Sequence, residues 1–224
     1  MDSKLLYRFL TEEAAIKTIE SWSFKVGRVL DFNDPFEWRF GLNNIRKDSE
    51  EHAEIFVQLA CKKLHELFGV ICFSGTLKDP VLWSHYADRH RGIVIEVDHY
   101  IDPQRIIEVK YTNERPTLDA SQLGNPDYFP SVWREKITQL IGRKSPGWSY
   151  EQEWRSIIEL KQCEARNGFY FTPIPPDFVK RIILGSESKL GLGYIQQVLE
   201  QRRVKNVSVT KARKSIDTFE ILAQ

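Results

Sequence analysis

The sequence predicts an α+β protein, with a mixed, mostly antiparallel β core of about eight short strands and about five flanking helices. Strand-like and helix-like segments follow one another in mixed order, and both tight connections and long crossovers join the strands. The chain has 224 residues, of which 42% are hydrophobic, so it is long enough to bury one large core. We therefore expect a single domain over residues 1–224.

Composition argues against several classes of partner. The formal net charge is +1, so no charge excess favours nucleic acid or a membrane surface. The sequence has no apolar run of about eighteen residues and no signal-peptide pattern, so we expect a cytoplasmic protein without a membrane partner. Cys61, Cys72 and Cys163 are widely spaced without a CxxC motif, which predicts reduced thiols and no metal site.

The first elements are an apolar strand and a capped helix. Residues 5–10, LLYRFL, read as a strand, and Thr11 is a suitable N-cap for the helix that follows. That helix is expected to bury Ala15, Ile16, Ile19 and Trp22. A second strand over residues 24–30 must end at FNDPFE, residues 32–37, because Pro35 lacks a backbone donor.

A long helix and a buried strand are predicted next. Asp48 and Glu51 form a capping-box pattern. The helix that they open carries apolar residues at helical spacing: Phe56, Leu59, Leu64 and Leu67. Residues 69–75 then read as a strand bounded by glycines.

Asp79 and Pro80 predict the start of a short helix, as cap and first-turn residue. Residues 92–98 read as a buried strand. Residues 106–112 alternate in polarity and are expected to pair with it. The polar segment 113–129 is the expected mobile loop or lid.

The remaining elements are a helix near residues 131–143, a strand over 153–160 and short strands in FYFTPI and RIILGS. A helix over residues 193–203 should turn Tyr194, Ile195, Val198 and Leu199 inward. The C-terminal stretch is expected to form a hairpin or a final strand.

The stretch YEQEWR, residues 150–155, is the first candidate for chemistry. If it enters a strand, Glu151 and Glu153 point to one face, because side chains alternate with period two. Two close carboxylates repel, which raises the pKa of at least one of them. The pair either stabilises a developing cation or forms an exposed strand face, with solvated acids that pair with Arg155.

Two further stretches each allow two interpretations. In WSHYADRH, residues 83–90, the histidines are five apart, so they do not form a helical metal pair. His85, Tyr86 and Trp83 either line a pocket or belong partly to the core.

In LYRF, Arg8 either holds a phosphate or carboxylate through its planar guanidinium or lies on a strand face that meets solvent.

FNDPFE follows Asp31 and brings several oxygen ligands together. Asp31, Asp34 and Glu37 would suit Mg²⁺, which prefers oxygen ligands. Asn-Asp-Pro is also a strong turn former, because Asn and Asp side chains bond nearby backbone groups. We expect Pro35 and the two phenylalanines to anchor a bend in the core, with Asp34 bracing the loop and Glu37 at the rim of a pocket.

Seven motifs together resemble a widespread bacterial family, known as domain of unknown function 2971. In order they are LYRFL, FNDPFE, ICFSGT, LWSHYADRHRGIVIEVD, VKYT, WSYEQEWR and RIILGS. The family resembles the ADP-ribosyltransferase superfamily in layout, and relatives occur among phage-defence and toxin-like genes.

The resemblance implies an ADP-ribosyltransferase-like fold and an enzyme that uses NAD as a substrate. Such an enzyme breaks the nicotinamide–ribose bond and transfers ADP-ribose to a protein, a nucleic acid or water. An antitoxin or another defence-system component is the implied partner.

The resemblance also places roles on residues. Arg8, beside Tyr7, matches the position that holds the ribose or phosphates. Tyr86, Trp83 or Phe36 would stack on nicotinamide, with His85 nearby. Glu153 would contact the ribose 2′-hydroxyl and stabilise the oxocarbenium-like transition state, with Glu151 as the upstream acid.

Two other functions fit the residues. A metal-dependent nuclease would use Asp31, Asp34, Glu37 and Glu151. A non-enzymatic module would sense a nucleotide or a phage component, and its ligand would stabilise the fold without turnover.

Overall fold

The computed structural model describes residues 4–45, 50–99, 106–122 and 136–223. In this part of the chain, eleven strands form one large sheet and two pairs of short strands form separate ladders. The α+β class is confirmed, and the large sheet is mostly antiparallel. The strands are more numerous than the eight expected, because several of them are only two or three residues long.

The large sheet has the order β11-β12-β2-β4-β1-β5-β13-β14-β15, and β10 joins β4 and β6 beside this path. Its strands are β1 (Leu5–Leu10), β2 (Ser23–Arg28), β4 (Phe68–Ser74), β5 (Ile93–Asp98), β6 (Ile106–Glu108), β10 (Glu153–Glu159), β11 (Glu164–Arg166), β12 (Phe169–Pro173), β13 (Val179–Leu184), β14 (Ser208–Lys214) and β15 (Ile221–Ala223). The two short parallel pairs are β3 (Gly41–Asn43) with β8 (Thr117–Asp119), and β7 (Lys110–Tyr111) with β9 (Arg143–Lys144).

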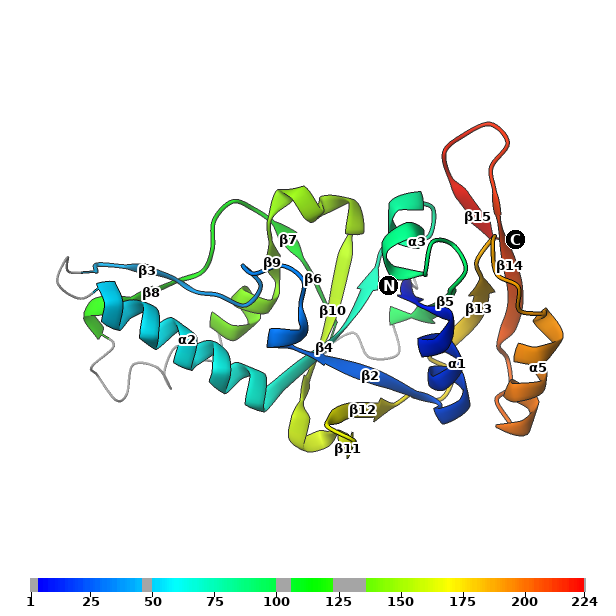
Figure 1. Cartoon of the computed structure of the whole chain (residues 1–224), viewed down its shortest axis with the longest axis horizontal. Coiled ribbons are helices and arrows are strands. Elements are labelled where there is room, and N and C mark those ends of the chain that lie inside the picture. Colours follow the sequence, from blue (N-terminus) through cyan, green and yellow to red (C-terminus); the bar gives the residue numbers. More distant parts are fainter. Residues whose placement is uncertain (1–3, 46–49, 100–105, 123–135, 224) are drawn as a thin grey trace.

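The helices lie around this sheet, with α2 towards one end of the molecule and α5 at the other (Figure 1). Their bounds are α1 (Glu12–Ser21), α2 (Glu50–Leu67), α3 (Pro80–Tyr86) and α5 (Leu192–Gln201), and residues 136–141 are also helical. Short 3-10 segments are η1 (Val29–Asp31), η4 (Ala120–Gln122), η5 (Pro146–Glu151) and η6 (Leu160–Gln162).

Local signals set the helix starts as expected. The Thr11 hydroxyl accepts a hydrogen bond from the backbone N–H of Ala14, and α1 begins at the next residue after Thr11. The Asp79 carboxylate accepts from the N–H of Val81 at 2.7 Å, and Pro80 occupies the first position of α3. Strand β5 lies between β1 and β13 and is buried along its apolar run, which explains its continuous hydrophobicity.

Strand β4 is the branch point of the sheet. Ser74 pairs with Tyr7 of β1 and with Glu153 of β10, so these two strands lie on opposite edges of β4. Val70 pairs in the same way with Gly27 of β2 and with β10. Strands β1 and β2 therefore share one edge of β4 and diverge from each other along it. We call this divergence the fork.

Several sequence expectations need correction. Residues 106–112 do not pair with β5: β6 pairs with β10 and β7 pairs with β9. The apolar spacing in α2 also predicted part of its buried face wrongly, because Leu59 is 60% exposed and Leu67 is 40% exposed. The residues that α2 does bury are Ala53, Val57, Ala60, Cys61 and Leu64. Tyr194 of α5 was expected to face inward, but it is exposed. Its hydroxyl donates a hydrogen bond to Glu20 of α1 at the surface.

Other expectations fall partly outside the described residues. Asp48 of the expected capping box lies there, as do residues 123–129 of the expected lid. The described part of that segment contains β8 and η4. Expected helical residues 136–141 are confirmed, and the rest of that helix before residue 136 is not described.

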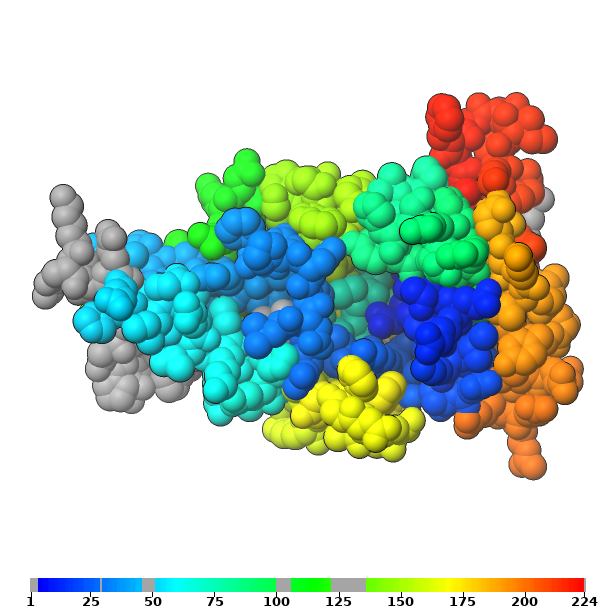
Figure 2. Space-filling view, viewed as in Figure 1, coloured from blue at the N-terminus to red at the C-terminus, as the bar shows by residue number. Residues whose placement is uncertain are grey.

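The C-terminal hairpin of β14 and β15 protrudes from the body of the molecule (Figure 2). Ile216 and Phe219 in its loop are 92% and 98% exposed. The hairpin expected from the sequence is confirmed. None of the helices in the described ranges is long and apolar enough to cross a membrane.

Gly92 is a strong test of the packing between the chain after α3 and β1. A Cβ at this position would lie 2.1 Å from the backbone oxygen of Leu10 and 2.9 Å from the backbone of Ala87. We expect Gly92→Ala to lower the free energy of unfolding by about 1–3 kcal/mol, measured by urea denaturation.

Gly193→Ala is the matched control, because a Cβ there meets nothing within 4 Å and the residue lies in α5. It should leave stability unchanged or raise it slightly, because alanine favours helix. Equal losses in the two variants would contradict this account of the packing.

Candidate functional site

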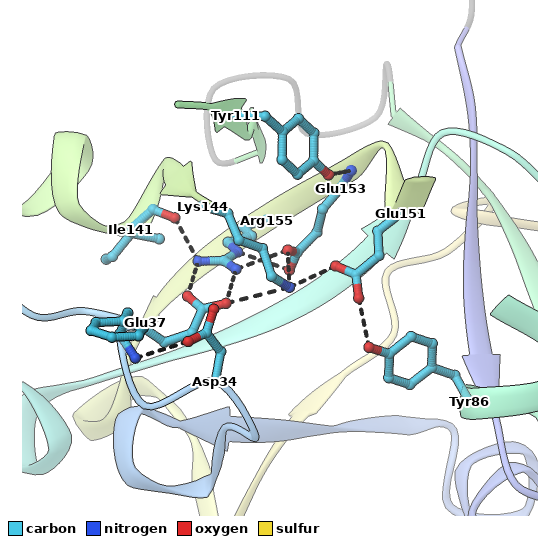
Figure 3. Close-up of polar contacts among 10 residues, drawn as sticks. Asp34, Glu37, Tyr86, Tyr111, Ile141, Lys144, Glu151, Glu153 and Arg155 are labelled. Atoms are coloured by element: carbon cyan, nitrogen blue, oxygen red, sulfur yellow. Dashed lines mark hydrogen bonds and ion pairs between the residues drawn. The ribbon is translucent and has the colours of Figure 1, made fainter. Parts of the chain in front are cut away.

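Arg155 of β10 is the centre of a buried charged cluster (Figure 3). It is 0% exposed. Its guanidinium binds both oxygens of Glu37 at 2.8 and 2.9 Å and both oxygens of Glu153 at 2.8 Å. The fifth N–H contact goes to the carbonyl of Ile141 at 2.7 Å. All five donors of the guanidinium are therefore satisfied, which is what a buried arginine requires.

Lys144 of β9 is the second cation of the cluster. Its Nζ lies 2.6 Å from Glu151, 3.0 Å from Glu153 and 3.3 Å from Glu37. One ammonium thus bridges three carboxylates. We call Glu37, Lys144, Glu151, Glu153 and Arg155 the charged cluster; its three acids and two cations leave one net negative charge when all are ionised.

The backbone around the acids is fixed by hydrogen bonds from neighbouring strands. Gln152 between them adopts φ 45°, a left-handed conformation, and its carbonyl accepts the N–H of Gly75 at 2.8 Å. The Ser74 hydroxyl donates to the carbonyl of Glu151 at 2.6 Å. Because of this kink, Glu151 ends η5 and Glu153 begins β10, yet both carboxylates reach Lys144.

Two tyrosines complete the surroundings of the acids. The Tyr86 hydroxyl of α3 donates to Glu151 Oε1 at 2.6 Å and also hydrogen bonds with Asn33. The Tyr111 hydroxyl accepts the backbone N–H of Glu153 at 2.7 Å. Burial, partly offset by that backbone hydrogen bond, raises the pKa of Tyr111 to about 12.

The two acids of YEQEWR have opposite electrostatic surroundings. Burial raises the pKa of Glu151 above its ordinary value, and Lys144 and Tyr86 offset this only in part. Burial acts in the same direction on Glu153, but Arg155 and Lys144 outweigh it and lower the pKa of Glu153 to about 2. Glu153 is therefore a fixed anion, whereas Glu151 is the acid that is easier to protonate. The alternative of an exposed strand face with solvated acids is wrong, since the two residues are 5% and 4% exposed.

A cavity of about 250 Å³ opens beside this cluster, at the fork between β1 and β2. We call it the fork cavity. The elements that line it are β1, β2, β4, α3 and the FNDPFE segment. The lining residues include Tyr7, Arg8, Phe32, Asn33, Cys72, Ser74, Tyr86, Lys144, Glu151 and Glu153.

Arg8 joins the two arms of the fork. Its Nη1 donates to the carbonyl of Cys72 on β4 at 3.0 Å, and its Nη2 donates to the carbonyl of Lys25 on β2 at 3.1 Å. Its Nε is buried and has no hydrogen-bond partner among the described residues. The guanidinium thus serves the fold, with two of its five N–H groups bonded to these carbonyls.

Five residues singled out from the sequence meet in the fork cavity: Tyr7, Arg8, Tyr86, Glu151 and Glu153. Their assigned roles in binding and catalysis stay predictions. Residues more than 140 positions apart in sequence are thus brought together by the pairing of β4 with both β1 and β10.

Three other candidates lie elsewhere. Trp83 is 0% exposed and donates its indole N–H to the carbonyl of Leu77, so it is a core residue. His85 is exposed and contacts the edges of Tyr86 and Tyr150, outside the cavity lining. Phe36 is 62% exposed and lines a different cavity.

FNDPFE is partly what the sequence predicts. Asp34 is buried and accepts the backbone N–H of Phe36 at 2.9 Å, so the bracing of the turn is confirmed. The exposed Phe36 does not anchor the bend; Trp38, 1% exposed and stacked on Phe32, does so. Glu37 is buried in the charged cluster, and it lines a neighbouring cavity but not the cavity at the fork.

The acids proposed for a metal site do not converge. In the described ranges no group of three or more His, Cys, Asp or Glu residues has the geometry to hold a metal ion. Asp31 lies 3.9 Å from Arg28, and Glu37 and Glu151 both pair with Lys144. The geometry thus gives the nuclease alternative no metal-binding centre among these residues.

The two cations of the charged cluster, Lys144 and Arg155, were not recognised from the sequence as site residues. Arg155 lies inside YEQEWR and was weighed only as a surface partner of the acids. Lys144 lies before the SPGWS turn, and no local pattern marks it. The buried ion pair with Glu37, 118 residues away, is a purely tertiary contact.

Part of this site lies in a segment that matches a known protein family. Residues 82–156 match the family model described as Protein of unknown function (DUF2971). This segment belongs to the DUF2971 family. It carries Tyr86, Lys144, Glu151, Glu153 and Arg155, so most of the charged cluster lies inside the DUF2971 segment, whereas Arg8 and Glu37 lie outside it. No curated protein and no solved structure matches the chain.

Arg155→Met tests how far the DUF2971 segment depends on the buried guanidinium. Removing it leaves Glu37 and Glu153 buried without their main partner, so the free energy of unfolding should fall by about 3–5 kcal/mol in urea denaturation. Arg166→Met, at an exposed pair with Glu164, is the control and should change little. A stable Arg155→Met protein would contradict the central role of Arg155.

The lowered pKa of Glu153 predicts a dependence of stability on pH. Because the folded pKa of about 2 lies below the ordinary 4.5, the fold favours the ionised form. That stabilisation is complete above about pH 4.5 and is lost as the pH falls through about 2. The unfolding free energy of the wild type should therefore fall more steeply over this window than that of Glu153→Gln. Identical slopes in the two proteins would contradict the assignment. Glu114→Gln, at an exposed acid outside the charged cluster, is the control and should keep the slope of the wild type.

Proposed function

We propose that the fork cavity binds NAD and that the protein is an ADP-ribosyltransferase-like enzyme that breaks the nicotinamide–ribose bond. The observation that carries this proposal is the convergence of Arg8, Tyr86, Glu151 and Glu153 on one cavity. An arginine for phosphate, an aromatic ring for nicotinamide and paired acids for the ribose are the groups that this reaction needs.

The chemistry follows from the charges of the site. When the glycosidic C–N bond breaks, its electron pair leaves with the nicotinamide nitrogen and positive charge develops on the ribose. Glu153, held anionic by Arg155 and Lys144, provides a fixed negative charge near that cation. An electrostatic contribution of this kind lowers the barrier because the charge is in place before the bond breaks.

Glu151 has the role of proton acceptor in this proposal. Its pKa is raised by burial, and its carboxylate is held by Tyr86 and Lys144. An acceptor O–H or N–H attacks the ribose carbon, a new bond forms, and the proton passes to Glu151. With water as the acceptor, the same step is NAD hydrolysis.

Arg8 supports the phosphate-binding part of the proposal. Its Nε is buried without a partner among the described residues, so an anionic oxygen would satisfy it. The cavity of about 250 Å³ is smaller than typical small-ligand sites of roughly 300–1,000 Å³. It therefore fits the nicotinamide, the ribose and the adjoining phosphate of NAD, with the remainder of the molecule extending towards the opening. The wider setting, as a phage-defence or toxin effector with an antitoxin or defence-system partner in the cytoplasm, belongs to the same proposal.

Nicotinamide release is the direct test. Wild-type protein incubated with NAD should release nicotinamide, measured by liquid chromatography, and Glu151→Gln should slow release about 10²–10⁴-fold, as expected for loss of a general base. Glu164→Gln, which changes an exposed acid on β11, is the control and should keep full activity. Absence of both NAD binding and nicotinamide release, with protein and nucleic acid acceptors supplied, would contradict the proposal.

One observation favours a second candidate, a non-enzymatic module that senses a nucleotide. Both oxygens of Glu153 and both oxygens of Glu151 already accept hydrogen bonds within the protein. Carboxylates whose oxygens all accept hydrogen bonds within the protein can be purely structural. This candidate predicts that NAD raises the melting temperature with no turnover, and the same assay distinguishes the two.

A further inference from the structure

A second cavity of about 240 Å³ also borders the charged cluster, through Glu37 and Lys144. Lys144 is the residue that lines both. The walls of the second cavity come from FNDPFE, from residues 112–116 and from β9 with Ser145. We call it the arginine cavity, because Arg39, Arg115 and Arg143 all line it.

The charges of the arginine cavity are unevenly paired. Arg39 is bound by Glu54 on α2. The side chain of Arg143 forms no hydrogen bond or ion pair with another described residue. The guanidinium of Arg115 also forms no hydrogen bond in the described part of the chain; its carbon lies 5.6 Å from the centroid of the Phe36 ring, and its charge also acts on Glu54. Two guanidinium groups are therefore available to a ligand. Each presents several N–H donors in a plane, the geometry that suits phosphate oxygens.

The acids of the same cavity are mostly engaged elsewhere. Asp34 accepts the N–H of Phe36, and Glu37 is bound on both oxygens by Arg155. Glu114 is the remaining acid in the lining, and it is exposed. The accessible charge therefore favours an anion over a cation.

Phe36 adds an aromatic surface beside these cations. It is 62% exposed, although it lies between the buried residues Asp34 and Glu37. An exposed phenylalanine on a braced turn offers a fixed face on which an unsaturated ring can stack. Phosphate-binding arginines next to a stacking ring are the combination that recognises a nucleotide.

We propose that the arginine cavity binds a nucleoside phosphate, with its phosphate on Arg115 and Arg143 and its base against Phe36. Its volume suits a single nucleotide unit, either free or within a single strand. The inference does not depend on the proposed reaction in the fork cavity.

The test is binding of uridine monophosphate to the full chain by isothermal titration calorimetry, since this ligand contains no part of NAD. Arg143→Gln and Arg115→Gln should each weaken binding about tenfold, because each removes a charged hydrogen bond to phosphate. Glu114→Gln should tighten binding, because it removes a like charge. Arg213→Gln, an exposed arginine on β14, is the matched control and should leave affinity unchanged.

Further arms separate the parts of the ligand. Phe36→Leu should weaken uridine monophosphate binding and leave pyrophosphate binding unchanged, because only the base needs the ring. A single strand is identified as the ligand if tetrauridylate binds more tightly than uridine monophosphate and its affinity depends more steeply on salt. Equal affinity of the two ligands identifies a free nucleotide instead.

Two results would overturn the proposal: no binding of any of these ligands at millimolar concentration, or binding that Arg143→Gln and Arg115→Gln both leave unchanged. Circular dichroism of each variant checks that the fold is retained. Glu151→Gln separates this site from the proposed reaction, because it should slow nicotinamide release and keep uridine monophosphate binding.

Discussion

The buried guanidinium of Arg155 is the contact on which the centre of this protein depends. It joins the FNDPFE segment, through Glu37, to the start of β10, through Glu153, and to the helical residues 136–141, through the Ile141 carbonyl. Within the described ranges, these three parts of the chain share no continuous hydrogen-bonded ladder. A buried charge is tolerated only when each donor has a partner, so the positions of all three are determined together.

Two constraints around this guanidinium create the space for a ligand. Lys144 holds three carboxylates together that would otherwise repel, which keeps Glu151 and Glu153 at the wall of the fork cavity. Arg8 spans β2 and β4 where the sheet divides. The cavity therefore arises where regular strand pairing is interrupted, and its polar groups are those that the interruption leaves available.

The same arrangement places Lys144 between two cavities of different chemistry. The fork cavity is lined by two acids and two tyrosines together with Arg8, whereas the arginine cavity is lined by three arginines and an exposed ring together with Glu114. Lys144 lines both cavities, so its ammonium contributes to the walls of both proposed sites while its three carboxylate partners hold it in place.

The sequence by itself determined the local features of the protein. Thr11 and Asp79 cap helices through contacts two or three residues away, Asp34 braces its turn, and the apolar run of β5 marks a buried strand. Tyr7, Arg8, Tyr86 and the two acids were also recognisable, because they lie in stretches that resemble the motifs of one family. Only the tertiary structure decided which of these residues meet. Pairing of β4 with β1 and β10, and the ion pair of Glu37 with Arg155, join positions 67 to 118 residues apart, and no local pattern encodes such distances. For the same reason Trp83 and Phe36, alike as aromatic residues in a motif, proved to be a core residue and a surface residue: burial is set by what packs against a side chain, not by its own neighbours in sequence.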